Sequence, residues 1–253
     1  MTVRVYVVTW CKEVESLYGT TLVFPTLRVG FPTAELHVVD NASLAAVRPI
    51  LRNQAAICGA TFTEMTQEIS HHELIERTLE SQAEGTAIFV DPDVCFWKSV
   101  EGWRFDALMA GRLLPKYACE YTACVTHPRL HTSLLWIPDV GSLREAIQAV
   151  RAQFFEFQPF RPIMCRLGDV WHRWDTGASL YAALPERMHP FTERELEAYD
   201  HLFCGTHLRE VVAKIRPDYA LLFERIHQHV KGDRRSLKGA WRIQDDYFAA
   251  LAI

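Results

Sequence analysis

Runs of apolar and β-branched residues alternate with amphipathic segments in the first part of the chain. Such runs predict strands at residues 4–9 (RVYVVT), 35–39 (ELHVV) and 86–90 (TAIFV). The run at 86–90 carries no charge, as expected for a strand that is buried on both faces of a sheet. Strands that alternate with helical segments indicate an α/β fold with a mostly parallel central sheet and helices on both faces.

Capping residues and the helical spacing of apolar positions predict the helices between these strands. Ser70 begins a Ser-His-His-Glu segment that fits a capping box, and the helix after it is expected to end by Gly85. Ser43 can cap a second helix that runs toward Gly59, and Pro49 is expected to kink that helix.

The second half of the chain has a less regular pattern. An apolar run at residues 130–137 predicts another strand. Residues 158–175 contain prolines, tryptophans and several charges, which predicts an irregular loop. Helices are expected at residues 142–157, 178–184 and 208–230. The helix at 208–230 should break at Pro217.

Length and composition narrow the class of protein. The chain has 253 residues, a formal net charge of -4 and 49% hydrophobic residues, values typical of a globular protein. This charge gives no support for nucleic-acid binding. No apolar run approaches the ~20 residues that cross a bilayer, and the N-terminus lacks a signal-peptide pattern. The irregular spacing of the seven cysteines favours a reducing compartment, and we therefore expect a cytoplasmic protein.

The chain shows neither a repeat nor a linker, so residues 1–253 are interpreted as one domain. Segment 231–242 is basic, and its side chains form either a solvated face or a peripheral contact with anionic lipid or a pyrophosphate group. The basic residues are Lys231, Arg234, Arg235, Lys238 and Arg242.

Carboxylates follow two of the predicted strands, at the sheet edge where α/β proteins bind ligands. Asp40 follows the second strand, and Asp91-Pro92-Asp93 follows the strand at 86–90. Two carboxylates so close to each other repel, unless a divalent cation lies between them. Mn²⁺ and Mg²⁺ prefer oxygen ligands and keep positions open for water and phosphate oxygens. The pattern therefore predicts a Mn²⁺ or Mg²⁺ site at Asp91 and Asp93, with a surface turn as the alternative.

These two segments resemble nucleotide-sugar-dependent glycosyltransferases of the GT-A fold, similar to families 2 and 8. Residues 38–43 (VVDNAS) resemble a segment whose Asp contacts the nucleotide, and residues 89–93 (FVDPD) resemble the DxD motif. The resemblance implies that Asp40 contacts the base or ribose. It also implies that Asp91 faces the ribose and donor sugar, and that Asp93 coordinates the metal on the diphosphate. Asp40 can instead cap the following helix.

Further positions in the second half are similar to this family. Residues 131–135 (HTSLL) resemble a strand that lines the donor sugar, with His131 in place of Asn. Asp175 stands where the family has an acid near the reacting sugar, which implies a catalytic base in an inverting enzyme. His201 resembles a C-terminal metal ligand, and His207 is its rival. The alternatives are a turn-forming Asp and a histidine satisfied by hydrogen bonds in the core.

The resemblance implies a metal-dependent glycosyltransferase, with nucleotide binding by residues 1–105 and with acceptor binding and the C-terminal part in residues 106–253. Its donor would be a nucleoside diphosphate sugar, and its acceptor a hydroxyl of a carbohydrate or a lipid-linked molecule. A nucleotidyltransferase is one alternative, and it predicts a Gly-rich, basic loop after the first strand, where this chain has only residues 10–13 (WCKE). A non-catalytic protein that binds nucleotides or sugars is the other, and loss of Asp91 or Asp93 would have favoured it.

Overall fold

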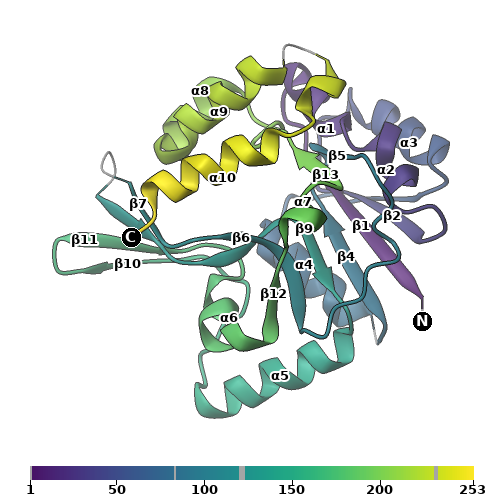
Figure 1. The fold of residues 1–253 in the computed structure, drawn as a ribbon. Helices are drawn as coiled ribbons and strands as arrows, with labels where there is room; N and C mark the ends of the chain where they lie inside the picture. Colours follow the sequence, from purple (N-terminus) through teal and green to yellow (C-terminus); the bar gives the residue numbers. More distant parts are fainter. Residues whose placement is uncertain (1, 83, 120–122, 231–232) are drawn as a thin grey trace.

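A mostly parallel β-sheet with helices on both faces forms the centre of the molecule (Figure 1). The computed structural model describes residues 2–82, 84–119, 123–230 and 233–253. Within this part of the chain, the strand order is β12-β6-β9-β4-β1-β2-β3. Strand β9 runs antiparallel to β4 and β6, and the other adjacent pairs are parallel. The strands are β1 (Val3–Thr9), β2 (Glu35–Asp40), β3 (Thr61–Glu64), β4 (Thr86–Val90), β6 (Met109–Leu114), β9 (Arg129–Ile137) and β12 (Met188–Pro190).

The predicted fold class and the four predicted strands are confirmed. Every residue of β4 is buried, because helices cover both faces of this central strand. Val5 and Val7 of β1 belong to a core cluster that includes α2 and α3, whereas Tyr6 belongs to one with α4 and α5. The helices are α1 (Leu17–Thr21), α2 (Phe24–Gly30), α3 (Arg48–Ile57), α4 (His71–Ser81), α5 (Val140–Gln153), α6 (Ala178–Ala183), α7 (Glu193–Leu196), α8 (Arg209–Ile215), α9 (Pro217–Val230) and α10 (Ala240–Leu251).

Two smaller sheets and the last three helices complete the described fold (Figure 1). Strands β5 (Val94–Phe96) and β13 (Tyr199–His201) form an antiparallel pair. A four-stranded sheet contains β7 (Tyr117–Cys119), β8 (Cys124–Thr126), β10 (Ile163–Leu167) and β11 (Val170–Trp174). Helices α8, α9 and α10 share a third core cluster, which reaches Phe203 in the loop after β13. These helices lie at the top of Figure 1.

The irregular loop predicted for residues 158–175 is wrong in part. Strands β10 and β11 form an antiparallel hairpin there, and Gly168 adopts a φ of 62° in its turn. Ile163 and Trp171 of this hairpin are exposed. Because apolar side chains are exposed along the hairpin, the alternation of apolar and polar residues that marks a half-buried strand is missing.

Two details of the predicted helices also need correction. Helix α3 begins at Arg48 and not after Ser43, so Pro49 lies in the first turn, where its missing N–H costs nothing. Ser70 precedes α4, but its side chain makes no capping hydrogen bond. A capping box forms instead at Thr192 of α7, where the side chain of Glu195 reaches back to the Thr192 N–H.

Several predictions about the whole chain remain predictions. Both proposed halves contribute strands to the central sheet, and the assignment of nucleotide binding to 1–105 and acceptor binding to 106–253 stays a prediction. None of the described helices has the length and apolar character needed to cross a membrane. Lys231 of the basic segment lies outside the described residues. Arg234 and Arg235 form a 3₁₀ turn, and lipid contact by this segment is untested.

Candidate active site

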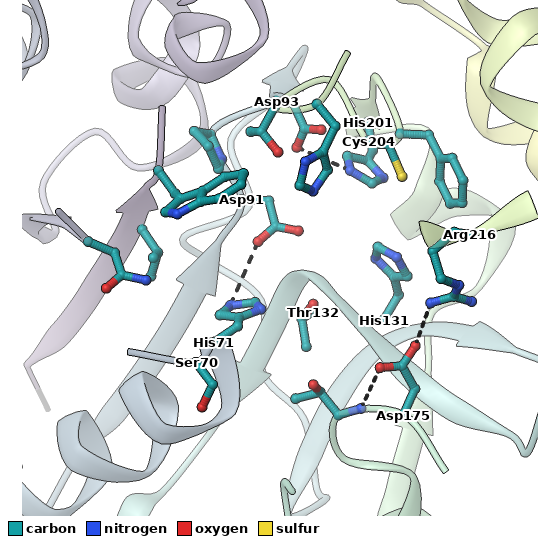
Figure 2. A pocket seen from close by; sticks show the side chains of 18 of the residues that line it. Ser70, His71, Asp91, Asp93, His131, Thr132, Asp175, His201, Cys204 and Arg216 are labelled. Atoms are coloured by element: carbon teal, nitrogen blue, oxygen red, sulfur yellow. Dashed lines mark hydrogen bonds and ion pairs between the residues drawn. The ribbon is translucent and has the colours of Figure 1, made fainter. Parts of the chain in front are cut away.

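A pocket of about 440 Å³ opens at the edge of the central sheet where β1 and β4 end (Figure 2). Trp10 and Asn41 line it just beyond β1 and β2, and Asp91 and Asp93 line it beyond β4. Because β9 is antiparallel, its first residues lie at the same edge. The segments 201–207 and 212–219 complete the walls from the C-terminal part. The pocket therefore lies where α/β sheets bind ligands.

Three of the predicted site residues converge at one end of this pocket. Ligand atoms of Asp91, Asp93 and His201 all lie within 4.8 Å of one another. No other described residues form such a group of three or more His, Cys, Asp or Glu ligands. The pairing of β13 with β5 explains the proximity, because it places His201 opposite Val94, the residue after Asp93. The acidic pair and the distant histidine can together offer oxygen and nitrogen ligands to Mn²⁺ or Mg²⁺.

The two carboxylates of this group have opposite electrostatic surroundings. Burial favours the neutral form of Asp93, but His201 and the backbone N–H of Gly205 offset it and hold the Asp93 pKa below its ordinary value. The distances are 3.1 Å from His201 Nε2 to Asp93 Oδ1 and 2.7 Å from Gly205 N to Asp93 Oδ2. Burial and the neighbouring Asp93 raise the pKa of Asp91. A bound cation would relieve this repulsion and favour two ionised carboxylates.

The loop after His201 has a strained backbone. Phe203 and Cys204 adopt φ angles of 56° and 57°, a region that costs non-glycine residues about 1–3 kcal/mol each. These turns direct the Gly205 N–H at Asp93 and bring His207 to the pocket wall. Strain of this kind persists where the surrounding structure fixes the chain, as it does beside binding sites.

The structure places the rival histidines differently. His207 packs edge-to-face on Trp10 with a centroid distance of 5.1 Å, and it is not part of the group around Asp93. The geometry therefore favours His201 over His207 as the third ligand, and this assignment stays a prediction.

Alanine variants of the two histidines are expected to separate these roles. His201→Ala should raise the Mn²⁺ concentration needed for nucleotide binding by at least about 10-fold, because loss of a ligand atom costs no less than the ~10–100-fold known for residues behind a ligand. His207→Ala should leave this concentration nearly unchanged and serves as the matched control. Isothermal titration of Mn²⁺ in the presence of nucleotide measures both. A larger effect of His207→Ala would make His207 the ligand.

Asp40 lies behind the pocket wall. Its side chain is fully buried and accepts hydrogen bonds from Thr9 Oγ1 at 3.1 Å and Ser43 N at 3.3 Å. It also forms an ion pair with Arg48 at 3.2 Å. Protein groups therefore already occupy the Asp40 carboxylate. Direct contact of Asp40 with a base or ribose stays a prediction. The observed contacts hold the turn that presents its neighbour Asn41 to the pocket.

Asp175 reaches the other end of the same pocket (Figure 2). Its Oδ2 atom lies 2.9 Å from Arg129 Nη2 and 2.9 Å from Arg216 Nη1. The N–H of Thr176 donates to Oδ1 at 2.9 Å. Burial alone would raise the Asp175 pKa, but these arginines and hydrogen bonds hold it well below its ordinary value. Asp175 is thus a weakly basic carboxylate, and its assignment as the catalytic base stays a prediction.

His131 lies between the two ends of the pocket (Figure 2). The N–H of Ser133 donates to His131 Nδ1 at 3.1 Å, so the proton of the neutral ring is on Nε2. Burial, together with His201, lowers the pKa of His131 well below its ordinary value. His131 therefore offers the pocket one N–H donor.

Sequence reasoning missed the pocket residues that contact Asp91 and Asp175. Its first-turn position in α4 predicts a solvated side chain for His71, yet His71 Nε2 lies 3.9 Å from Asp91 Oδ1. Arg129 and Arg216 carry no motif that marks them as pocket residues. Their shared contact with Asp175 identifies them, and that contact joins segments far apart in the sequence.

Comparisons with known proteins give similarity in structure alone. The sequence matches no protein-family model and no curated protein. Its solved neighbours include a mannosyltransferase from Pyrobaculum calidifontis, in complex with GDP-Man and Mn²⁺. That structure is 13% identical with a TM-score of 0.46, and the match covers 100% of this chain and 77% of the other.

Two other neighbours illustrate the range. The glycosyltransferase GlyE of Streptococcus pneumoniae is 8% identical with a TM-score of 0.48, and the match covers 100% of this chain and 65% of GlyE. A nucleoside-diphosphate-sugar pyrophosphorylase of Vibrio cholerae is 9% identical with a TM-score of 0.44, and the match covers 87% of this chain and 99% of that one. Similarity this low does not identify a reaction or single out one family, so the function has to be inferred from the pocket.

Proposed function

We propose that this protein is a glycosyltransferase that uses a nucleoside diphosphate sugar and a divalent metal, Mn²⁺ or Mg²⁺. The observation that carries the proposal is the convergence of Asp91, Asp93 and His201 at the end of a buried parallel strand, inside an open pocket. Two carboxylates and an imidazole are suitable ligands for such a cation. They lie at the edge of the sheet where α/β proteins bind ligands such as nucleotides.

The residues would divide the work between metal and donor. Asp91, Asp93 and His201 would hold the cation, which neutralises the charge that develops on a leaving diphosphate. The Gly205 N–H fixes the orientation of Asp93. Trp10 and Asn41 lie on the side of the pocket that continues β1 and β2, and we assign them to the nucleoside. His131, between the two ends of the pocket, would donate a hydrogen bond from its Nε2–H to the nucleotide sugar.

The acid–base chemistry depends on the stereochemical course. An inverting transfer needs a base for the acceptor hydroxyl, and Asp175 is the residue that the sequence suggests for it. Its two arginine contacts make it a poor proton acceptor, which favours a different role for Asp175. A retaining transfer does not need a base in that position. The acceptor, whether carbohydrate or lipid-linked, is likewise part of the proposal only.

Thermal unfolding with nucleotides tests the proposal. UDP, GDP and the other nucleoside diphosphates should be compared with their triphosphates, each with Mn²⁺ and with a chelator. We expect one nucleoside diphosphate to raise the melting temperature only when Mn²⁺ or Mg²⁺ is present. The matching nucleotide sugar should then release the diphosphate slowly in water.

Other outcomes would point elsewhere. A preference for a triphosphate with release of pyrophosphate would indicate nucleotidyl transfer. Metal-dependent binding without any turnover, with a panel of sugar acceptors present, would indicate a binding protein. Absence of metal-dependent nucleotide binding would overturn the proposal.

A further inference from the structure

The two ends of the pocket carry opposite charges. Asp91 and Asp93 lie at one end, and Arg216 lies with Asp175 at the other, with His131 between them (Figure 2). Arg129 belongs to this second end, because its guanidinium contacts the same Asp175 oxygen as Arg216 does. The site proposed for metal and diphosphate uses only the acidic end, so the arginine end has no assigned ligand.

Arg129 is built into the wall and is incompletely satisfied. Its side chain is 5% exposed, and its Nη2 atom contacts Asp175 at 2.9 Å and the Tyr219 hydroxyl at 3.0 Å. The Nη1 atom is buried without a hydrogen-bond partner among the described residues. Buried donors are normally paired, and a guanidinium is always charged, so this nitrogen lacks an acceptor that a ligand can supply.

The contacts of Asp175 limit what it can neutralise. Both arginines approach the same oxygen, Oδ2, while Oδ1 accepts from the Thr176 N–H. One carboxylate thus serves two guanidinium groups. Guanidinium donors form a planar fork that matches the oxygens of a carboxylate or a phosphate.

We infer that the arginine end is a subsite for a second anionic group, a carboxylate or phosphate distinct from the donor diphosphate. The anion would be bound by Arg129 Nη1 and the neighbouring Arg216, with Asp175 as the built-in competitor. The assignment of this group to the transferred sugar or to the acceptor rests on the proposed glycosyltransferase function. Binding of the anion itself does not.

The inference is tested with inorganic phosphate and glucuronate as probes, and glucose as the neutral control. Titrations in a chelator keep phosphate from binding through a metal at the acidic end. We expect wild-type protein to bind one anion but not glucose, and the tighter anion assigns the carrier group. Arg129→Gln should abolish this binding. Lys98→Gln, which removes an exposed positive charge elsewhere, should leave it unchanged.

Asp175→Asn gives a result of opposite sign. Removing the competing carboxylate should tighten anion binding by about tenfold or more, because residue 175 then no longer offers the two arginines a negative charge. A loss of folding cannot imitate a gain in affinity, so this variant decides the matter even if Arg129→Gln does not fold. Failure of wild type and Asp175→Asn to bind either anion would overturn the inference.

A final competition separates this subsite from the donor site. With Mn²⁺ and the nucleoside diphosphate bound, the anion should still bind. Complete displacement of the anion by the nucleoside diphosphate would mean that the arginines bind the diphosphate. It would overturn the proposal of a second anionic group. If nucleotide never binds with metal but the anion does, the proposed function fails while the anion subsite stands.

Discussion

Asp93→Asn is expected to abolish metal-dependent nucleotide binding while leaving the chain folded. Asp93 is 2% exposed, contacts His201, and is the carboxylate whose pKa is held low, so it is the ionised ligand ready for a cation. Substitution of residues behind a metal ligand costs about 10–100-fold in metal affinity, so loss of the ligand charge should cost at least about 100-fold. Asn keeps the side-chain shape and an oxygen for the Gly205 N–H, which preserves the fold.

Isothermal titration of Mn²⁺ with nucleotide measures this effect, and circular dichroism checks the fold. Asp106→Asn makes the same substitution at an exposed position and should change neither quantity. An unchanged Mn²⁺ affinity in Asp93→Asn would remove Asp93 from the site. The metal assignment would then have to pass to Asp91 and His71, which lie 3.9 Å apart.

Gly19→Ala is expected to damage both stability and the metal site, although Gly19 carries no side chain and lies in helix α1. A Cβ atom at this position would overlap the carbonyl oxygen of Gly205, the residue whose N–H donates to Asp93. Relief of that clash must move backbone, and overpacking of this kind costs about 1–3 kcal/mol or more. Within a helix, Ala is otherwise favoured over Gly by about 1 kcal/mol, so the expected sign opposes helix propensity.

Urea unfolding and Mn²⁺ titration of Gly19→Ala measure the two effects. Thr21→Ala, in the same helix, is the control, because the Thr21 hydroxyl bonds only to carbonyls of its own helix. Gly19→Ala with wild-type stability and Mn²⁺ affinity would show that the Gly19–Gly205 contact is unimportant for the site.

Local sequence determined the central strands and the acidic end of the pocket. A strand buried on both faces has to be uncharged throughout, so residues 86–90 were recognisable from composition alone. Asp91 and Asp93 follow that strand directly. Recognition of the strand therefore also places these two residues at its end. The break between α8 and α9 at Pro217 was equally local, because Pro cannot continue a helix.

Predictions from local sequence were incomplete or wrong where the environment of a residue depends on residues far away in the sequence. Asp40 ends a strand as predicted, yet Thr9 and Arg48 enclose its carboxylate, and the chain on either side of Asp40 does not reveal this. The hairpin of β10 and β11 was hidden because its apolar side chains are exposed, so no burial pattern marks its period.

The tertiary structure alone decided how the site is completed. His201 reaches Asp93 because β13 pairs antiparallel with β5, and a shift of that register by one residue would turn His201 to the opposite face. Arg129 belongs to β9 and Arg216 follows α8, and the fold brings both of them to Asp175. Sequence by itself determined which residues carry charge and where strands end. Long-range pairing and packing decided which of those charges face one another, because such contacts depend on the whole chain and not on neighbours in sequence.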